Sequence, residues 1–139
     1  MTVPGLTTIA SDFGPKETMD RLEAEVRAKG MEVFARVDHA AGARQAGMNL
    51  RPTEVLIFGA AKGGTPLMQA SQTMGIDLPL KALVWEDESG QTWISTNDPT
   101  WLAQRHGVEA MAGGVARALS DMLAALTKNA ASGGAAASA

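Results

Sequence analysis

An acidic residue and a histidine stand side by side at Asp38 and His39, within the stretch RVDHAAGA at 36–43. A histidine oriented by a carboxylate can act as a general acid or base near neutral pH, as a hydrolase or an isomerase would require. Adjacent side chains of a strand point to opposite faces, so the two can cooperate only if the chain turns between them. The small residues that follow permit such a turn. They equally allow Asp38 to cap a helix that begins near Ala40 while His39 packs at a strand end.

A glycine-rich segment, FGAAKGGTP at 58–66, provides a second group of candidate residues. We expect a strand to end at its start, a flexible loop to carry Lys62, and a helix to begin at Thr65. The N–H groups of that helix start and of Gly63 and Gly64, with the Lys62 ammonium, could hold a phosphate or a carboxylate. The segment is not a Walker A motif, since the required residue order is absent. The alternative is a plain Thr65 cap preceded by glycines that make a tight turn.

Further side chains could line an apolar pocket beside this segment. Met68 lies in the expected helix, and methionine suits an adaptable pocket as well as a core. Trp85 and Trp93 lie on consecutive expected strands, where they could be cross-strand neighbours and form a stacking surface for a flat ligand. The same tryptophans could belong to the core or to a dimer interface. The predicted ligand-binding set is Lys62, Gly63, Gly64, Thr65, Met68 and Trp85.

Other chemically active residue types form no convincing motif. Glu86, Asp87 and Asp98 end or follow expected strands and could place two carboxylates at one end of a sheet, but turn and cap roles also explain them. The chain has two histidines and no cysteine, with neither an H-x-x-x-H nor an H-E-x-x-H spacing. We therefore predict no metal site, although His39 and His106 could in principle converge with carboxylates. No cofactor is expected.

The composition is that of a globular chain without an obvious macromolecular ligand. Its 139 residues suggest one domain, and 45% hydrophobic residues suffice for a core. The net charge of −3 argues against a nucleic-acid partner, which would need clustered Lys and Arg. No apolar run of about 18 residues and no leader-like start occur, so we expect no membrane partner and a cytoplasmic location.

Hydrophobic periodicity predicts an α+β fold. Strands are expected at 6–10, 31–38, 54–58, 81–86 and 91–95, and helices at 15–29, 40–48, 65–74, 98–106 and 108–126. The odd-numbered residues of 31–38 should share one face, and the apolar strand 54–58 should be covered on both sides. A late hairpin favours a mainly antiparallel sheet with helices packed on one face. This single compact domain should span 1–128, and 129–139 should be a disordered Ala/Gly/Ser tail.

Four stretches in a fixed order resemble the DUF302 family, a domain of unknown function. They are VFARVDHAAGA at 33–43, LRPTEVLIFGAAKGGTPLMQA at 50–70, IDLPLKALVWED at 76–87 and TWISTNDPTWLAQRHG at 92–107. The resemblance covers most of residues 5–127 and implies a compact α+β domain that forms a homodimer. It implies no established activity. The Ala-rich tail lies outside the resemblance.

Two functions from different classes are compatible with these residues, together with a third, structural role. The first is a small dimeric module that binds an apolar or anionic small molecule between the sheet and the helix at 65–74, near Lys62, Thr65, His39 and Trp85. The second is an acid–base enzyme that uses Asp38 and His39. The third is a dimeric interaction scaffold whose interface includes Phe34 and the helix at 108–126.

Overall fold

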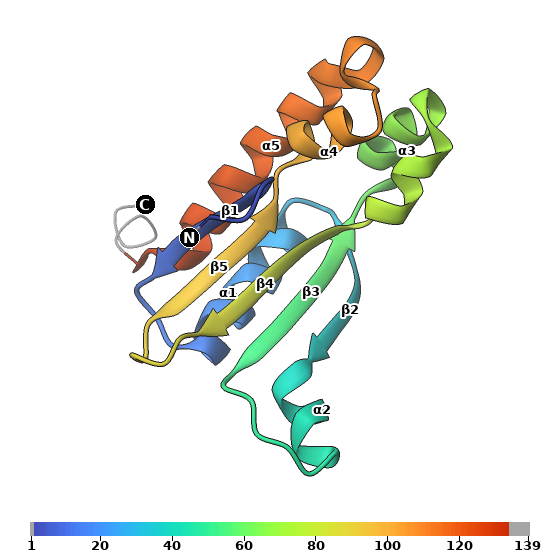
Figure 1. Cartoon of the computed structure of the whole chain (residues 1–139). Coiled ribbons are helices and arrows are strands. Elements are labelled where there is room, and N and C mark those ends of the chain that lie inside the picture. Colours follow the sequence, from blue (N-terminus) through green and yellow to red (C-terminus); the bar gives the residue numbers. More distant parts are fainter. Residues whose placement is uncertain (1, 134–139) are drawn as a thin grey trace.

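A computed structural model describes residues 2–133, which form one antiparallel sheet with helices behind one face and at both ends (Figure 1). The strands run in the order β1-β5-β4-β3-β2 across the sheet, and every neighbouring pair is antiparallel. The strands are β1 (Leu6–Ser11), β2 (Glu32–Asp38), β3 (Thr53–Gly59), β4 (Leu80–Glu86) and β5 (Thr92–Asn97). The helices are α1 (Pro15–Ala28), α2 (His39–Gln45), α3 (Ala61–Ala70), the 3-10 helix η1 (Gln72–Asp77), α4 (Pro99–Arg105) and α5 (Glu109–Ala131). This arrangement confirms the predicted α+β class.

Local sequence signals set the ends of several helices. α1 begins with Pro15 at its first position, and Gly30 ends it in the left-handed conformation with φ +76°, which glycine adopts at little cost. α4 begins at Pro99 because Asp98 caps it: the Asp98 carboxylate accepts a hydrogen bond of 3.0 Å from the Thr100 N–H. These helix starts are where the sequence predicted them.

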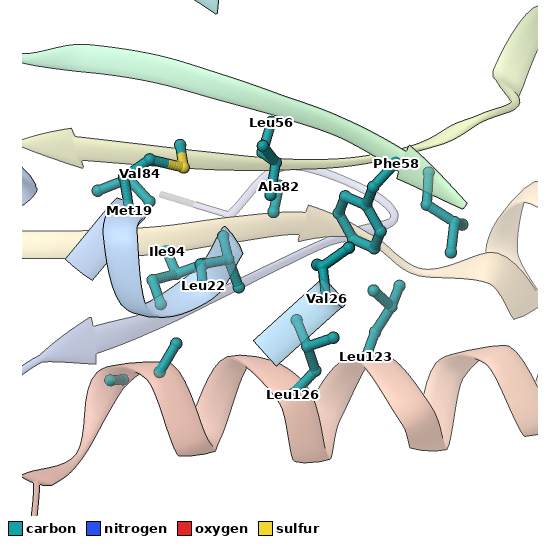
Figure 2. Close-up of a cluster of buried hydrophobic side chains, with 13 residues drawn as sticks. Met19, Leu22, Val26, Leu56, Phe58, Ala82, Val84, Ile94, Leu123 and Leu126 are labelled. Atoms are coloured by element: carbon teal, nitrogen blue, oxygen red, sulfur yellow. The ribbon is translucent and has the colours of Figure 1, made fainter. Parts of the chain in front are cut away.

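The main core lies between the sheet and the two helices α1 and α5 (Figure 2). α1 buries one side completely, as its three- and four-residue apolar spacing predicts. The labelled side chains of this cluster are Met19, Leu22, Val26, Leu56, Phe58, Ala82, Val84, Ile94, Leu123 and Leu126. The strand residues among them all have even numbers, so the odd-numbered residues of β3, β4 and β5 point to the opposite face.

A second, smaller cluster lies where α3, η1 and α4 meet the first half of α5. Its buried members are Leu67, Met74, Leu102, Ala103, Val108, Ala112 and Ala116. Leu78 and Leu119 are partly buried and pack against both clusters. These two leucines therefore mark the boundary between the clusters.

The face of the sheet opposite the helices is bare among the described residues, and Figure 1 views the molecule from this side. On β3, Leu56 and Phe58 are fully buried against the helices, whereas Val55 and Ile57 lie on the bare face and are only half-buried. Within one chain, the prediction that the strand at 54–58 is covered on both sides is therefore wrong. Its nearly continuous apolar run instead supplies an exposed apolar surface.

A β-bulge interrupts the alternation of β2. The pairing with β3 shifts between Val33 and Ala35, which leaves Phe34 as an extra residue. Val33 opposes a core residue of β3 and packs against the core, but Ala35 and Val37 oppose residues of the bare face. The prediction that the odd-numbered residues of this strand share one face is wrong because of this bulge.

The last helix, α5, continues beyond its predicted end. It is kinked at Ala112 and runs to Ala131, which is buried, so residues 129–131 are helical rather than part of a tail. Arg21 of α1 holds this end: its guanidinium donates to the carbonyls of Asn129, Ala130 and Ser132 at 3.0–3.2 Å. Small alanines suit this close approach between α1 and α5. The rest of the expected tail, 134–139, lies outside the described residues.

Candidate functional site

α3 begins four residues earlier than the sequence predicted. The chain leaves β3 through the extended Ala60, and helical geometry starts at Ala61. The N–H groups of Gly63 and Gly64 both donate to the Ala60 carbonyl, at 3.0 and 3.1 Å. The prediction of a flexible glycine loop with a helix start at Thr65 is therefore wrong, and these two N–H groups are not free to hold an anion.

Proline is common at the first position of a helix, so Thr65-Pro66 predicted the start of α3 at that point. Pro66 lies in the second turn of α3. A proline near the beginning of a helix removes one hydrogen bond, and it does not end the helix when the neighbouring turns are held in place. Leu67, which follows it, is completely buried in the second cluster and anchors the helix. Pro66 therefore lies within α3 rather than at its start, and the burial of Leu67 holds the helix beyond the proline.

An apolar cavity of about 240 Å³ lies beside α3 at the boundary of the two clusters. Glycine and apolar residues line it throughout, from the end of β3, from α3, and from the segment that leads into β4. Leu78 and Leu119 both take part, as do Met31 and Phe34 from the β2 side. A cavity of this composition suits an apolar group of a ligand, with the pliable methionine and leucine side chains adapting to its shape.

The two glycines of α3 leave open the space on the helix side of this cavity. A Cβ at Gly64 would lie 3.5 Å from Leu78 Cδ1 and 3.9 Å from Met68 Cε, and a Cβ at Gly63 would lie 3.3 Å from Leu119 Cδ2. Neither glycine has a positive φ, so the backbone does not require glycine at either position. Glycine inside a helix costs about 1 kcal/mol relative to alanine. The effect of the two glycines is therefore to leave the cavity unfilled on the side of α3.

The structure brings together only part of the predicted ligand-binding set. Gly63, Gly64 and Met68 line the cavity, while Lys62 and Thr65 of the same helix are exposed and do not line it. Trp85 is elsewhere, near the opposite end of β4. Leu80, which lines the cavity, begins that strand, and Trp85 follows five residues later, a distance of about 17 Å along a strand.

Trp85 and Trp93 are cross-strand neighbours, as the sequence suggested. Their rings stack on the bare face of the sheet with centroids 6.2 Å apart. Each indole N–H already has a partner: Trp85 donates to Ser95 Oγ and Trp93 to Asp87 Oδ2, both at 2.9 Å. The pair is therefore a half-buried apolar platform rather than part of the helix-side core.

Asp38 has the capping role that was one of its two predicted interpretations. It is the N-cap of α2, and its Oδ1 accepts a hydrogen bond of 2.9 Å from the Ala41 N–H. It also lines a polar hollow of about 370 Å³ that includes Arg36 and Glu54. His39 is the first residue of α2, is exposed, and does not line this hollow. Within residues 2–133 no hydrogen bond joins Asp38 to His39.

The other predicted carboxylates have turn and cap roles and do not meet. Asp87 accepts hydrogen bonds from Trp93, Ser89 and the Gln91 N–H in the hairpin turn, and these bonds lower its pKa to about 2. Asp98 caps α4 at the other end of β5. The two carboxylates therefore lie at opposite ends of β5 and have the turn and cap roles that were one of their two predicted interpretations.

A carboxylate–imidazole–hydroxyl chain occurs at a place that the sequence did not single out. His106, the C-cap of α4, has its Nε2 2.6 Å from Asp77 Oδ2 and its Nδ1 2.8 Å from Thr73 Oγ1. Ser71 Oγ lies 2.9 Å from the same Thr73 oxygen. Arg105 Nη1 approaches both oxygens of Asp77, at 2.9 and 2.7 Å. The chain joins the end of α4 to η1.

These side chains differ in how far they reach the solvent. The side chains of His106 and Asp77 are 8% and 14% exposed, whereas Thr73 is exposed. Burial alone would raise the pKa of Asp77, but the hydrogen bond from His106 and the charge of Arg105 outweigh it and lower that pKa. Asp77 is therefore ionised at neutral pH. Among residues 2–133, no three histidine, aspartate or glutamate side chains are grouped as metal ligands.

The sequence offered little signal for this group. Asp77 and His106 are 29 residues apart, and neither belongs to a spaced motif. His106 was considered only as a possible metal ligand. The one usable signal was the end of α4, where Gly107 adopts φ +68° and fixes the preceding histidine as the C-cap.

Comparisons with known proteins agree on one family. The family described as domain of unknown function DUF302 matches residues 7–126. The crystal structure of an uncharacterized conserved DUF302 protein from Bacillus stearothermophilus superimposes with a TM-score of 0.82 at 22% identity, covering 92% of this chain and 99% of that one. This similarity supports the fold. Among the described residues, no helix combines the length and the apolar character needed to cross a bilayer.

Curated relatives come from Brucella. Proteins named fluoride-specific ion channel FluC 1 from Brucella suis and FluC 2 from Brucella melitensis are each 53% identical to this chain over 104 residues. The match covers 75% of this chain but only 41% and 38% of those relatives, so the chain spans about two fifths of their length. The matched residues of the family extend over most of the sheet and both helices that cover it. The chain therefore belongs to the DUF302 family.

Proposed function

We propose that this protein is a binding module that takes the apolar part of a small molecule into the cavity beside α3. The observation that carries the proposal is the pair of glycines, Gly63 and Gly64, in the first turn of α3, where no positive φ requires them. Side chains at these positions would occupy the cavity. A helix whose first turn lacks side chains at these two positions, and so leaves an apolar cavity open, is suited to admit a ligand.

The chemistry of the cavity indicates the class of ligand. Since glycine and apolar residues line it, the part of the ligand that enters must be apolar, for example a hydrocarbon chain or a ring. Lys62 is exposed between two lining residues, Ala61 and Gly63, and so offers a positive charge to an anionic end that remains in solvent. An amphiphilic anion combines both features.

A small inorganic anion is a poor fit for the same cavity. The name of the Brucella relatives refers to fluoride. Fluoride in this cavity would be an unpaired ion in apolar surroundings, and its burial would cost far more free energy than the burial of a neutral group. That name also describes proteins of which this chain matches about two fifths. The proposal for this chain is therefore an organic ligand.

The test is a thermal-shift titration with a series of straight-chain carboxylates of increasing length, repeated on the Gly64→Leu variant. We expect a saturable increase in Tm for the wild type that grows with chain length until the cavity is filled. In Gly64→Leu the new side chain extends past Leu78 and Met68 into the cavity, so the increase in Tm should disappear. The unliganded variant should remain folded, because leucine favours a helix by roughly 0.8 kcal/mol over glycine.

Gly42→Leu is the matched control. Gly42 lies inside α2, at the other end of the sheet from α3, and a Cβ added there would meet no atom within 4 Å. This variant receives the same gain in helix propensity and should keep the full ligand-induced shift. A shift that survives in Gly64→Leu would place the ligand elsewhere, and a wild type that responds to no member of the series would remove the proposal.

A second function, self-association, is favoured by the bare face of the sheet. We propose that this face pairs with a second copy of the chain. Its three central strands carry Val55, Ile57, Leu83 and the stacked tryptophans, with Lys81 as their single charged residue there among those described. A nearly uncharged apolar face can meet its own copy without opposing like charges.

Sedimentation velocity tests this second proposal. The wild type should sediment as a dimer, and Leu83→Glu, which places a charge in the middle of the face, should convert it to a folded monomer. Met111→Glu is the control, because Met111 is 76% exposed on α5, in the helix layer. A monomeric wild type, or a dimer that Met111→Glu disrupts and Leu83→Glu leaves intact, would contradict the proposed interface.

A further inference from the structure

The hydrogen bonds that join Ser71, Thr73, His106 and Asp77 can all run in one direction. An ionised carboxylate only accepts hydrogen bonds, so His106 must donate its Nε2 proton to Asp77. In the tautomer that carries only this proton, the lone pair lies on Nδ1 and can accept from the Thr73 hydroxyl, 2.8 Å away. Because Thr73 donates in this direction, its oxygen is free to accept from Ser71 at 2.9 Å. In this tautomer both hydroxyl protons point toward His106, which is the direction that a general base requires.

This arrangement meets the structural requirements for an activated hydroxyl. A hydroxyl nucleophile needs a base within hydrogen-bonding distance, and the base needs a third group that fixes its tautomer and orientation. His106 and Asp77 supply these two roles at 2.8 and 2.6 Å. Arg105 in turn holds Asp77 through both carboxylate oxygens.

Burial separates the parts of the group in the way that such chemistry requires. Asp77 and His106 are largely buried, which keeps water from competing for their contact, whereas Thr73 is exposed and can be reached by a solute. The segment is also held in place: Met74, next to Thr73, is completely buried in the second cluster. The hydroxyl is therefore presented at the surface by a fixed support.

Other hydroxyl pairs of the molecule show what is particular about this one. Thr8 Oγ1 lies 2.8 Å from Ser95 Oγ, and Ser11 Oγ lies 2.7 Å from Thr18 Oγ1. Each of these pairs joins two alcohols, and no imidazole bonds to either pair among the described residues. A hydroxyl with no base beside it remains a weak nucleophile at neutral pH. Thr73 differs because it is bonded to a histidine.

We propose that Thr73 is a nucleophile, with His106 as its general base and Asp77 as the positioning group, and that the site accepts small carboxylic esters. Thr73 Oγ1 attacks the ester carbonyl carbon while its proton moves to His106 Nδ1. The bond to the alcohol oxygen breaks, and that oxygen takes the proton from Nδ1. Water then attacks the acyl-threonine, gives a proton to Nδ1, and releases the carboxylic acid as Thr73 recovers its proton. This site is separate from the apolar cavity of the proposed binding function.

The experiment treats the full chain with p-nitrophenyl acetate at neutral pH and follows nitrophenolate release together with the site of acetylation by peptide mass spectrometry. We expect acetyl on Thr73 in samples quenched early, followed by its slow loss through hydrolysis. Thr8, an exposed threonine bonded only to another alcohol, should remain unmodified in the same samples. Acetyl confined to lysines or the N-terminus would overturn the proposal.

Three variants separate a catalytic group from a structural one. Thr73→Val should abolish the acetylation while leaving the contact between His106 and Asp77, and Thr73→Ser should retain it. Asp77→Asn should slow acetylation about a hundredfold or more, because it no longer fixes the tautomer of His106. Equal rates of Thr73 acetylation in Asp77→Asn and the wild type would contradict the proposed relay. Unfolding midpoints confirm that each variant is folded, and if Asp77→Asn is not, the comparison of Thr73→Val with Thr73→Ser decides.

Discussion

The molecule contains two aspartate–histidine pairs. The two residues that are adjacent in the sequence make no contact through their side chains, whereas the two that are distant in the sequence do. Asp38 and His39 are adjacent in the chain, yet Asp38 bonds to a backbone N–H and His39 is exposed. Asp77 and His106 are 29 residues apart, yet their side chains approach to 2.6 Å. Adjacency along the chain therefore did not produce a chemical pair, whereas packing of η1 against the end of α4 did.

The difference follows from what each aspartate can satisfy locally. At the start of a helix, several backbone N–H groups have no partner, and Asp38 provides one for Ala41. The carboxylate is thereby committed to the helix. Asp77 ends a 3-10 helix, where no N–H groups await a partner, so its carboxylate is available to side chains from α4. Local backbone demand thus decides which acid remains free for a histidine.

The largest expected difference between the two pairs is in the free energy of unfolding lost when each histidine is replaced by alanine. His106→Ala removes hydrogen bonds to Asp77 and Thr73 from a side chain that is 8% exposed. At about 1 kcal/mol for each bond, we expect a loss of about 2 kcal/mol in the free energy of unfolding. His39→Ala removes an exposed side chain and should change it by less than about 0.5 kcal/mol. Urea unfolding of both variants measures the difference.

Equal losses of unfolding free energy in the two variants would contradict this difference, because they would mean that His39 makes stabilising contacts that the structure does not show. His106→Asn is a useful companion variant, since its amide can retain part of the hydrogen bonding. Its loss should lie between that of His106→Ala and zero. A His106→Asn variant that is as unstable as His106→Ala would assign the effect to ring packing rather than to the two bonds.

The sequence predicted the elements better than it predicted the site. The α+β class, the hairpin, the helix start at Pro15 and the cap at Asp98 depend on local signals, and the structure confirms them. The start of α3 was misplaced because Pro66 is a local signal of a helix start, whereas the N–H groups of Gly63 and Gly64 already bond to the Ala60 carbonyl one turn earlier. The bulge at Phe34 likewise arises from pairing with β3, which the sequence of β2 does not reveal.

The same distinction explains the site residues. Asp38 attracted attention because its neighbour in the sequence is a histidine, and the capping alternative was visible because small residues follow it. The sequence indicated nothing about His106 except that it is one of the two histidines of the chain. Its partners come from η1, and no pattern within either segment indicates that the two meet. A side-chain pair that forms only through tertiary packing can be identified only from the three-dimensional structure, even when every residue type is known.

The smallest expected effect concerns Asp38, and it tests whether its charge has any role beyond the cap. Asp38→Ala removes the bond to the Ala41 N–H and should cost about 1 kcal/mol in unfolding free energy. Asp38→Asn keeps a capping oxygen of similar strength and should cost only a few tenths of a kcal/mol. If asparagine instead costs as much as alanine, the carboxylate charge matters, and the polar hollow with Arg36 and Glu54 becomes the place to look for it. Urea unfolding at neutral pH, with hydrogen exchange at the Ala41 amide as a local readout, distinguishes a cap from a charge.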